Sequence, residues 1–149
     1  MWASLNTGFK QSFINFVNLN ITMEIKRIRF GKKGVETFLS PLEADVLKAM
    51  WELNKAKVRD IYNSLKDRRK VALTSVAVIL DRLYEKKLVS REAQTGRGGY
   101  HYIYSPSATK SDFEYSLIEN TVNKLIDTFG SSAVTYFNER FKNKAENKE

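Results

Sequence analysis

Hydrophobic and polar positions between residues 73 and 90 follow the periodicity of a helix with one apolar face. At about 100° per residue, that face collects branched side chains: Val76, Ile79, Leu80 and Leu83. The opposite face begins with short side chains rather than long charged ones: Thr74, Ser75, Ala77 and Val78. Short hydroxyl and methyl groups can read base edges in a DNA major groove. The segment is therefore either a base-reading helix or a core helix whose outer face is short by chance.

Two segments after this helix alternate in the manner of strands, and a glycine-rich tip at residues 95–99 joins them. The strands are predicted at residues 88–94 and 100–106. Tyr100, Tyr102 and Tyr104 alternate onto one face of the second strand. Arg97 lies in the tip, where an arginine is either solvated or in contact with a DNA phosphate. A helix that leads into such a hairpin is the layout of a winged helix, in which the hairpin follows the phosphate backbone.

Two more helical patterns precede the first one. Ser40-Pro-Leu-Glu43 is a capping box with proline at the first helical position, which predicts a helix start. Helical spacing continues through Leu42, Val46, Ala49, Met50 and Leu53, and a second short helix carries Val58, Ile61, Tyr62 and Leu65. Trp51 lies beside the first apolar stripe, so we expect it to be a packing residue. Three helices followed by a hairpin over residues 40–106 predict a winged helix-turn-helix, a mainly α fold with a small β-wing.

The C-terminal segment carries two further helical patterns, over residues 111–128 and from residue 133 onward, separated by Gly130-Ser-Ser132. Two helices cannot enclose so many large apolar groups, so they either fold back on the winged helix or pair with another chain. Pairing is favoured because a twofold dimer would place two recognition helices one DNA turn apart, on the order of 34 Å. The expected interface residues are Phe113, Leu117, Val122, Leu125, Phe129 and Phe137.

The predicted organisation has three parts: an N-terminal extension of uncertain role (1–22), a winged-helix DNA-binding domain (23–106) and a C-terminal helical dimerisation region (107–149). Phe9, Phe13, Phe16 and Val17 could form an amphipathic helix, far shorter than a membrane span. Met23 is an alternative translation start. The basic strip from Lys26 to Lys33 is either a DNA-contacting arm or a solvated strand edge.

Several segments form an ordered set of motifs: LEADVLKAMW (42–51), VRDI (58–61), TS (74–75), LDRLYEKKLV (80–89), GGYHYIYSP (98–106) and FGSSAVTYF (129–137). Over roughly residues 40–142 this set resembles the penicillinase-repressor (BlaI/MecI) family. The resemblance implies a homodimeric winged-helix repressor of a palindromic operator, which in some members is cleaved after a membrane sensor protease is triggered.

The chain departs from the family pattern at several positions. Lys87 occupies a position after the recognition helix where the family often has glycine, so it must adopt a left-handed conformation or end the helix differently. Ala77 stands where related repressors can carry arginine, so the operator sequence is not transferred. Asn120-Thr121 aligns with the family's Asn-Phe cleavage site, and this departure argues against proteolytic induction. The cysteine cluster of the copper-responsive branch is missing, because the chain contains no cysteine.

Charge supports a nucleic-acid partner independently of this resemblance. Residues 23–106 contain 18 Lys and Arg against 10 Asp and Glu, whereas residues 107–149 contain 6 against 7. The excess positive charge of the 149-residue chain, net +8, therefore lies on the predicted winged helix. The expected phosphate contacts are Arg68, Arg69, Lys70, Arg82 and Arg97.

Enzyme function is not expected. The chain has a single histidine, His101, and it lacks metal-ligand spacings, phosphate loops and nucleophile elbows. We expect a cytoplasmic, homodimeric transcriptional regulator without cofactor or metal, with double-stranded DNA as its partner. The alternative is a winged-helix protein–protein module of a transcription assembly, which would tolerate Asp81 and Glu85 on its recognition face. An enzyme with an unrecognised site is a weaker third reading.

Overall fold

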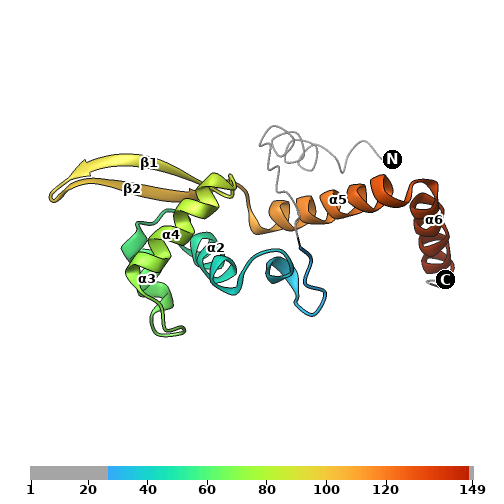
Figure 1. Ribbon diagram of the computed structural model, residues 1–149, viewed down its shortest axis with the longest axis horizontal. Coiled ribbons are helices and arrows are strands. Elements are labelled where there is room, and N and C mark those ends of the chain that lie inside the picture. The colour runs from blue at the N-terminus through green and yellow to red at the C-terminus, as the bar shows by residue number, and fades with distance from the viewer. Residues whose placement is uncertain (1–26, 148–149) are drawn as a thin grey trace. The chain divides into compact units, whose positions relative to one another are not determined.

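The computed structural model describes residues 27–147 (Figure 1). Contacts divide the chain into two compact units, Met1–Glu114 and Tyr115–Glu149. Within residues 27–147, the predicted helices and the hairpin are present, and a short 3-10 helix that the sequence pattern did not predict precedes them. In chain order the elements are η1 (Gly34–Thr37), α2 (Pro41–Leu53), α3 (Val58–Leu65), α4 (Leu73–Glu85), β1 (Val89–Gly96), β2 (Gly99–Pro106), α5 (Lys110–Phe129) and α6 (Ser131–Glu146).

Helix α2 begins with the predicted capping box. The Ser40 hydroxyl accepts a hydrogen bond from the Glu43 backbone N–H at 3.3 Å, and the Glu43 carboxylate accepts one from the Ser40 N–H at 2.9 Å. Pro41 occupies the first helical position, where its missing N–H costs no hydrogen bond. Two of the backbone groups that a helix start leaves unpaired are satisfied in this way.

The core of the first unit is built by the apolar faces of α2, α3 and α4. The predicted seam of α4 is buried, with Val76, Leu80 and Leu83 at 0% exposure. It packs with residues at helical spacing on the neighbouring helices: Val46, Leu47 and Met50 of α2 and Ile61 and Leu65 of α3. The periodicity that located the helices therefore also identified their buried faces.

Trp51 is a packing residue, as predicted. Its indole N–H donates to the Ala108 carbonyl at 3.0 Å, and its ring lies 5.7 Å from the ring of Phe113. This contact brings the first turn of α5 into the first unit, so the boundary between the units falls after Glu114 rather than after residue 106. Phe113, which the sequence pattern placed in the subunit interface, is 2% exposed and lies against Trp51 in the core of the first unit.

Helix α4 ends in a Schellman motif with a lysine at the position that glycine usually occupies. The N–H of Leu88 donates to the Leu83 carbonyl and the N–H of Lys87 to that of Tyr84, both at 2.9 Å. Lys87 has a φ of 61°, a left-handed conformation that costs an L-residue about 1–2 kcal/mol. The departure from the family pattern is therefore accommodated by strain at one residue, and the helix ends where a glycine would end it.

The end of α4 is tied to the start of α2. The Lys86 ammonium lies 2.7 Å from the Glu43 carboxylate, which also caps α2. Burial raises the pKa of Glu43, but the hydrogen bonds from Lys86 and Ser40 outweigh it, and the pKa is lowered overall. The carboxylate is therefore ionised at neutral pH and joins two helix ends.

The wing is an antiparallel hairpin of β1 and β2 that projects beyond the three helices in Figure 1. Its register pairs Val89 with Pro106 at the base and Gly96 with Gly99 at the tip. Gly98 and Gly99 both have a φ of 100°, which favours glycine and explains why the tip carries two of them. Of the residues described, the segment before η1 forms no strand, so the strand-edge reading of the basic strip does not hold over residues 27–33.

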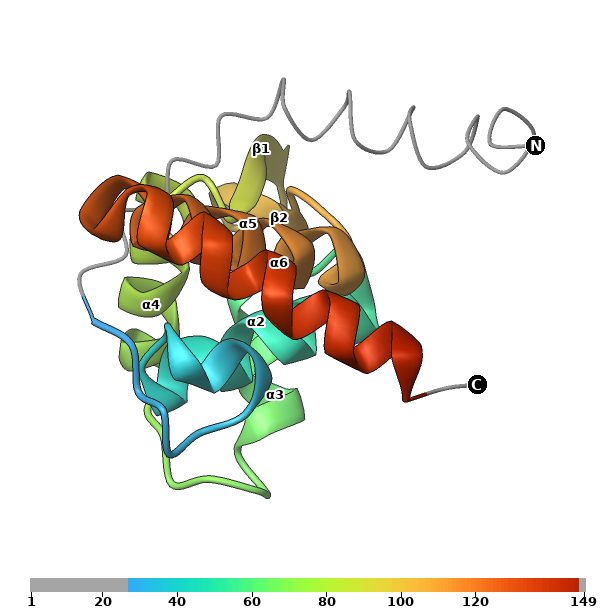
Figure 2. The same ribbon diagram turned by 90° about the vertical axis from the view of Figure 1, so that its right-hand side faces the viewer.

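The second unit contains the rest of α5 and α6. Figures 1 and 2 show that α6 turns sharply away at the end of α5, at Gly130, whose φ is 60°. None of the residues of α6 is buried. Over residues 27–147, no helix is long and apolar enough to cross a membrane. The sequence interpretation of residues 1–22 concerns positions outside the described part.

Candidate nucleic-acid interface

The outer face of α4 presents the short side chains that the sequence singled out. Thr74 is exposed and Val78 is 50% exposed, whereas Ser75 and Ala77 are half-buried. The residue that precedes the helix, Ala72, provides no side-chain cap. The first-turn N–H groups of α4 are thus left for an anion or water, and the positive end of the helix dipole favours an anion.

Exposed cations lie around this face. Lys70 precedes α4, Arg82 lies along it, and Arg97 lies at the tip of the wing. Each is a solvent-exposed side chain, so each could exchange water for a phosphate oxygen.

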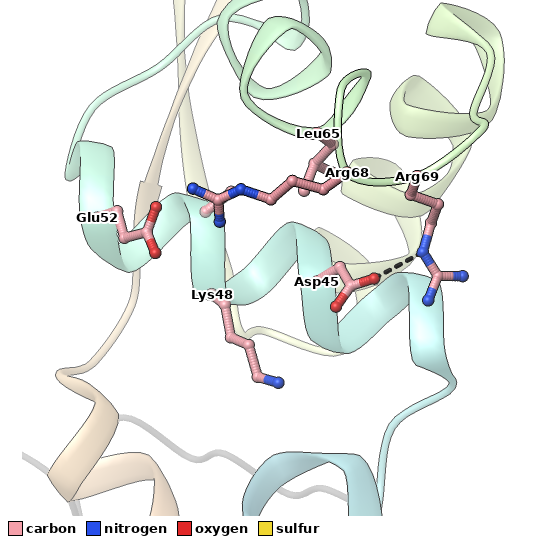
Figure 3. Close-up of a pocket in the computed structure, with 7 residues that line it drawn as sticks. Asp45, Lys48, Glu52, Leu65, Arg68 and Arg69 are labelled. Carbon is pink, nitrogen blue, oxygen red and sulfur yellow. Dashed lines mark ion pairs between the residues drawn. The ribbon is translucent and has the colours of Figure 1, made fainter.

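Arg68 and Arg69 are oriented differently from what the sequence alone suggests. Figure 3 shows that both side chains extend over α2. Together with Asp45 and Glu52 they line a hollow of about 250 Å³. The Arg69 guanidinium lies 2.7 Å from the Asp45 carboxylate in a partly exposed ion pair. Exposed pairs of this kind contribute about 0–1 kcal/mol. Arg69 therefore has a carboxylate partner that DNA would have to replace. Within residues 27–147, the other predicted phosphate contacts form no ion pair.

A cluster of side chains joins α4 to the base of the wing, and the sequence interpretation missed it. We name it the wing clamp: Asp81, Tyr84, Arg91, Tyr102 and Tyr104. The Arg91 guanidinium lies 2.9 Å from the Asp81 carboxylate, and the Tyr104 hydroxyl donates to the same oxygen at 3.4 Å. Counting outward from the glycine tip puts Arg91 opposite Tyr104, and this register was the available signal.

The clamp also changes the electrostatics of the α4 face. Burial raises the pKa of Tyr104, and the nearby Asp81 carboxylate adds to the rise, so the phenol stays protonated and remains a donor. Asp81, which the sequence left as an exposed acid on the recognition face, is paired with Arg91. The acidic character that favoured a protein–protein module is therefore reduced at this position.

The predicted interface residues fall into two groups. Phe113 and Leu117 are each 2% exposed within the single chain, so they offer little surface to a partner. Leu125, Phe129 and Phe137 come together in the second unit, and Val122 is half-buried. Leu125, Phe129 and Phe137, but not Val122, line an apolar groove of about 330 Å³, which we name the α5–α6 groove. Its lining residues are Leu125, Phe129, Ser132, Ala133, Tyr136 and Phe137.

The sequence of residues 39–149 matches the family described as Penicillinase repressor. The chain belongs to the penicillinase repressor family. It is thus a DNA-binding transcriptional regulator, and the resemblance seen in the sequence motifs is confirmed. No curated protein matches the chain.

Solved structures of transcription regulators are similar to the chain at low sequence identity. A possible transcriptional regulator from Methanosarcina mazei has 21% identity and a TM-score of 0.45, covering 68% of this chain and 78% of its own. A PadR family transcription regulator from Clostridium difficile has 15% identity and a TM-score of 0.42, and the match covers 59% of this chain and 96% of the regulator. ZitR of Lactococcus lactis, solved in complex with DNA, has 14% identity and a TM-score of 0.43, and the match covers 98% of this chain and 100% of ZitR. The penicillinase repressor family assignment rests on the family match rather than on these similarities.

Proposed function

We propose that this member of the penicillinase repressor family is a cytoplasmic, dimeric repressor that binds a palindromic operator. In the proposed complex, α4 enters the major groove and the wing follows the adjacent phosphate backbone. The observation that carries the proposal is the exposed face of α4, where short side chains lie beside a projecting hairpin with an arginine at its tip. Repression needs no catalytic step, because occupancy of a promoter is enough to exclude the transcription machinery.

Base reading is assigned to Thr74, Ser75, Ala77 and Val78. Hydroxyl groups can donate to or accept from base edges, and valine methyls can contact the methyl of thymine. Val78 is the strongest candidate because it is an apolar residue that is 50% exposed on this face of α4. The half-buried Ser75 and Ala77 let the helix backbone approach the groove closely.

Phosphate binding is assigned first to Lys70, Arg82 and Arg97, all exposed. Arg69 joins them if a phosphate replaces Asp45 as its partner, and Arg68 if it turns away from α2. These contacts fix the register of the protein on DNA without reading sequence. They also explain why the positive charge of the chain is concentrated in the winged helix.

Dimer formation is assigned to the C-terminal unit. Leu125, Phe129 and Phe137 line the α5–α6 groove, and large apolar groups on α6 are exposed, including Val134, Tyr136 and Phe141. A contiguous exposed apolar surface is typical of a subunit interface. A twofold axis through this unit would present two copies of α4 to successive major grooves.

Selection of bound sequences from random duplex DNA, with the full chain, tests the proposal. A palindromic consensus with two half-sites is the expected result. Val78→Ala should change which base is preferred at one position of each half-site, whereas Arg97→Ala should leave the consensus unchanged and weaken all sequences alike. If no sequence is enriched, the repressor proposal fails and the protein–protein module becomes the better explanation.

A further inference from the structure

The wing needs an anchor that its own backbone does not provide. A two-stranded hairpin is at best marginally stable in water, and most residues of β1 beyond Arg91 are exposed. At the base, the N–H of Ala56 donates to the Tyr104 carbonyl at 3.0 Å and the N–H of Tyr104 to the Ala56 carbonyl at 2.8 Å. These two bonds hold one point of β2, and a strand held at one point can still tilt.

The wing clamp supplies a second point of attachment, on α4. The Arg91 guanidinium contacts two aromatic rings: its central carbon lies 4.1 Å from the centre of the Tyr84 ring on α4 and 4.3 Å from that of the Tyr102 ring on β2. Its edge reaches the Asp81 carboxylate, one helical turn before Tyr84. The side chain of Arg91 is 25% exposed, so these contacts are partly shielded from water. A single planar group thus contacts a ring on each of the two elements and a carboxylate on α4.

We propose that Arg91 and Asp81 are positioning residues that set the angle between the wing and α4. This inference rests on the proposed function, because the angle decides whether Arg97 reaches a phosphate while α4 occupies the groove. Only a planar, delocalised cation can stack on two rings and bind a carboxylate at once, so lysine cannot replace Arg91. Asp81 holds the guanidinium in this plane although its own charge would repel DNA.

Two opposing charge effects make Asp81→Ala informative. If Asp81 acted only as a negative charge near DNA, its removal would tighten binding. If it orients Arg91, its removal weakens operator binding by at least about tenfold, the loss expected when a hydrogen bond to a charged group disappears. Glu85→Ala is the matched control, since it removes the same charge from the same exposed stretch of helix one turn later. The inference predicts opposite signs for the two variants, and equal signs would overturn it.

A second variant tests whether Arg91 acts through the wing tip. Arg91→Lys keeps the charge, so a simple phosphate contact would survive it. We expect Arg91→Lys to weaken operator binding by about tenfold, and Arg97→Ala to cost little more in that background, because the tip no longer reaches its phosphate. If Arg97→Ala costs the same in both backgrounds, Arg91 does not position the wing.

A measurement without DNA separates this inference from the proposed function. The chain has no cysteine, so Asn63→Cys on α3 and Gln94→Cys on β1 create one pair of spin labels per full chain. Mixing the labelled chain with an excess of unlabelled chain isolates the distance within one chain of the dimer. The distance distribution should be narrow with the native clamp and clearly broader with Asp81→Ala or Arg91→Lys. Equal widths would overturn the inference. If the native protein selects no DNA sequence, the proposed function fails while these widths still report on the clamp.

Discussion

The winged helix and the C-terminal unit bury their large apolar side chains to very different extents. In the winged helix, the seam of α4 and its partners on α2 and α3 are almost completely inaccessible. In the C-terminal unit, Phe129, Tyr136 and Phe141 are each more than 60% exposed and no residue of α6 is buried. The first unit completes its own core, whereas the second leaves an apolar surface that a second chain can cover.

Charge separates the same two regions. The excess of Lys and Arg lies before residue 107, and the residues that follow are close to neutral. A surface that binds phosphates needs positive charge, whereas the centre of a subunit interface is depleted of charge. This difference supports the proposal that the winged helix binds DNA and that the C-terminal unit forms the dimer.

Ionic strength should have the largest effect. If a dimer neutralises roughly 6–10 phosphates, log K should fall with log salt with a slope of about −5 to −9, which weakens binding about 10³–10⁵-fold between 50 and 200 mM salt. Titrations at several salt concentrations, read by fluorescence anisotropy on the selected operator, measure the slope. A flat response would contradict the assignment of DNA binding to the charged unit.

Leu125→Asp should produce monomers, because it puts a charge into the apolar α5–α6 groove. Operator affinity should then fall about 10²–10⁴-fold, the range expected when two linked sites become independent. Asn123→Asp introduces the same charge at an exposed position two residues earlier on α5 and should leave the dimer intact. Sedimentation velocity distinguishes the two variants, and a dimeric Leu125→Asp protein would place the interface elsewhere.

Truncations to alanine should depend differently on protein concentration in the two units. Leu80→Ala empties a fully buried site and should lower the free energy of unfolding by about 2–5 kcal/mol at any concentration. Phe129→Ala should destabilise mainly by weakening the dimer, so its effect should shrink as the protein is diluted and the native dimer itself dissociates. Urea unfolding at two concentrations a hundredfold apart measures this, and an equally concentration-independent loss for Phe129→Ala would remove the contrast between the units.

Within the winged helix, Arg97→Ala should weaken binding to all duplexes by about tenfold or somewhat more, the cost of one hydrogen bond to a charged group. Arg97→Lys keeps a point charge at the tip of the wing and should bind within about threefold of the native chain. Gel shifts on the operator and on an unrelated duplex show whether the loss is uniform. A loss confined to the operator would make Arg97 a base-reading residue.

The smallest expected effect concerns the end of α4. Lys87→Gly relieves a left-handed lysine but makes the unfolded chain more flexible, so it should stabilise the protein by at most about 1 kcal/mol. Chemical denaturation measures the difference. A loss of stability would mean that the Lys87 side chain makes a contribution larger than the strain.

Local signals made most of the fold predictable. The capping box at Ser40, the seam from Val76 to Leu83 and the glycine tip of the wing depend only on neighbouring residues, and the structure has each of them where the sequence placed it. The 3-10 helix η1 was missed because four residues carry no recognisable period. Side-chain partners across the fold were less accessible.

The pairs that the sequence did not predict join different elements. Asp45 with Arg69, Asp81 with Arg91 and Trp51 with Phe113 each depend on how two elements pack. Phe113 was therefore assigned to the subunit interface by its size and apolarity, although the winged-helix core already buries it. The base-facing set on α4 needed only helical periodicity, and its role in reading DNA stays a prediction.

In the proposed complex, two copies of the chain bind one palindrome, each through its own α4 and wing. Sedimentation equilibrium of the full chain with the selected duplex measures this stoichiometry most directly. We expect two chains on each palindromic duplex, with no stable complex of one chain even when DNA is in excess. A complex of one chain with one duplex that retains full affinity would contradict it.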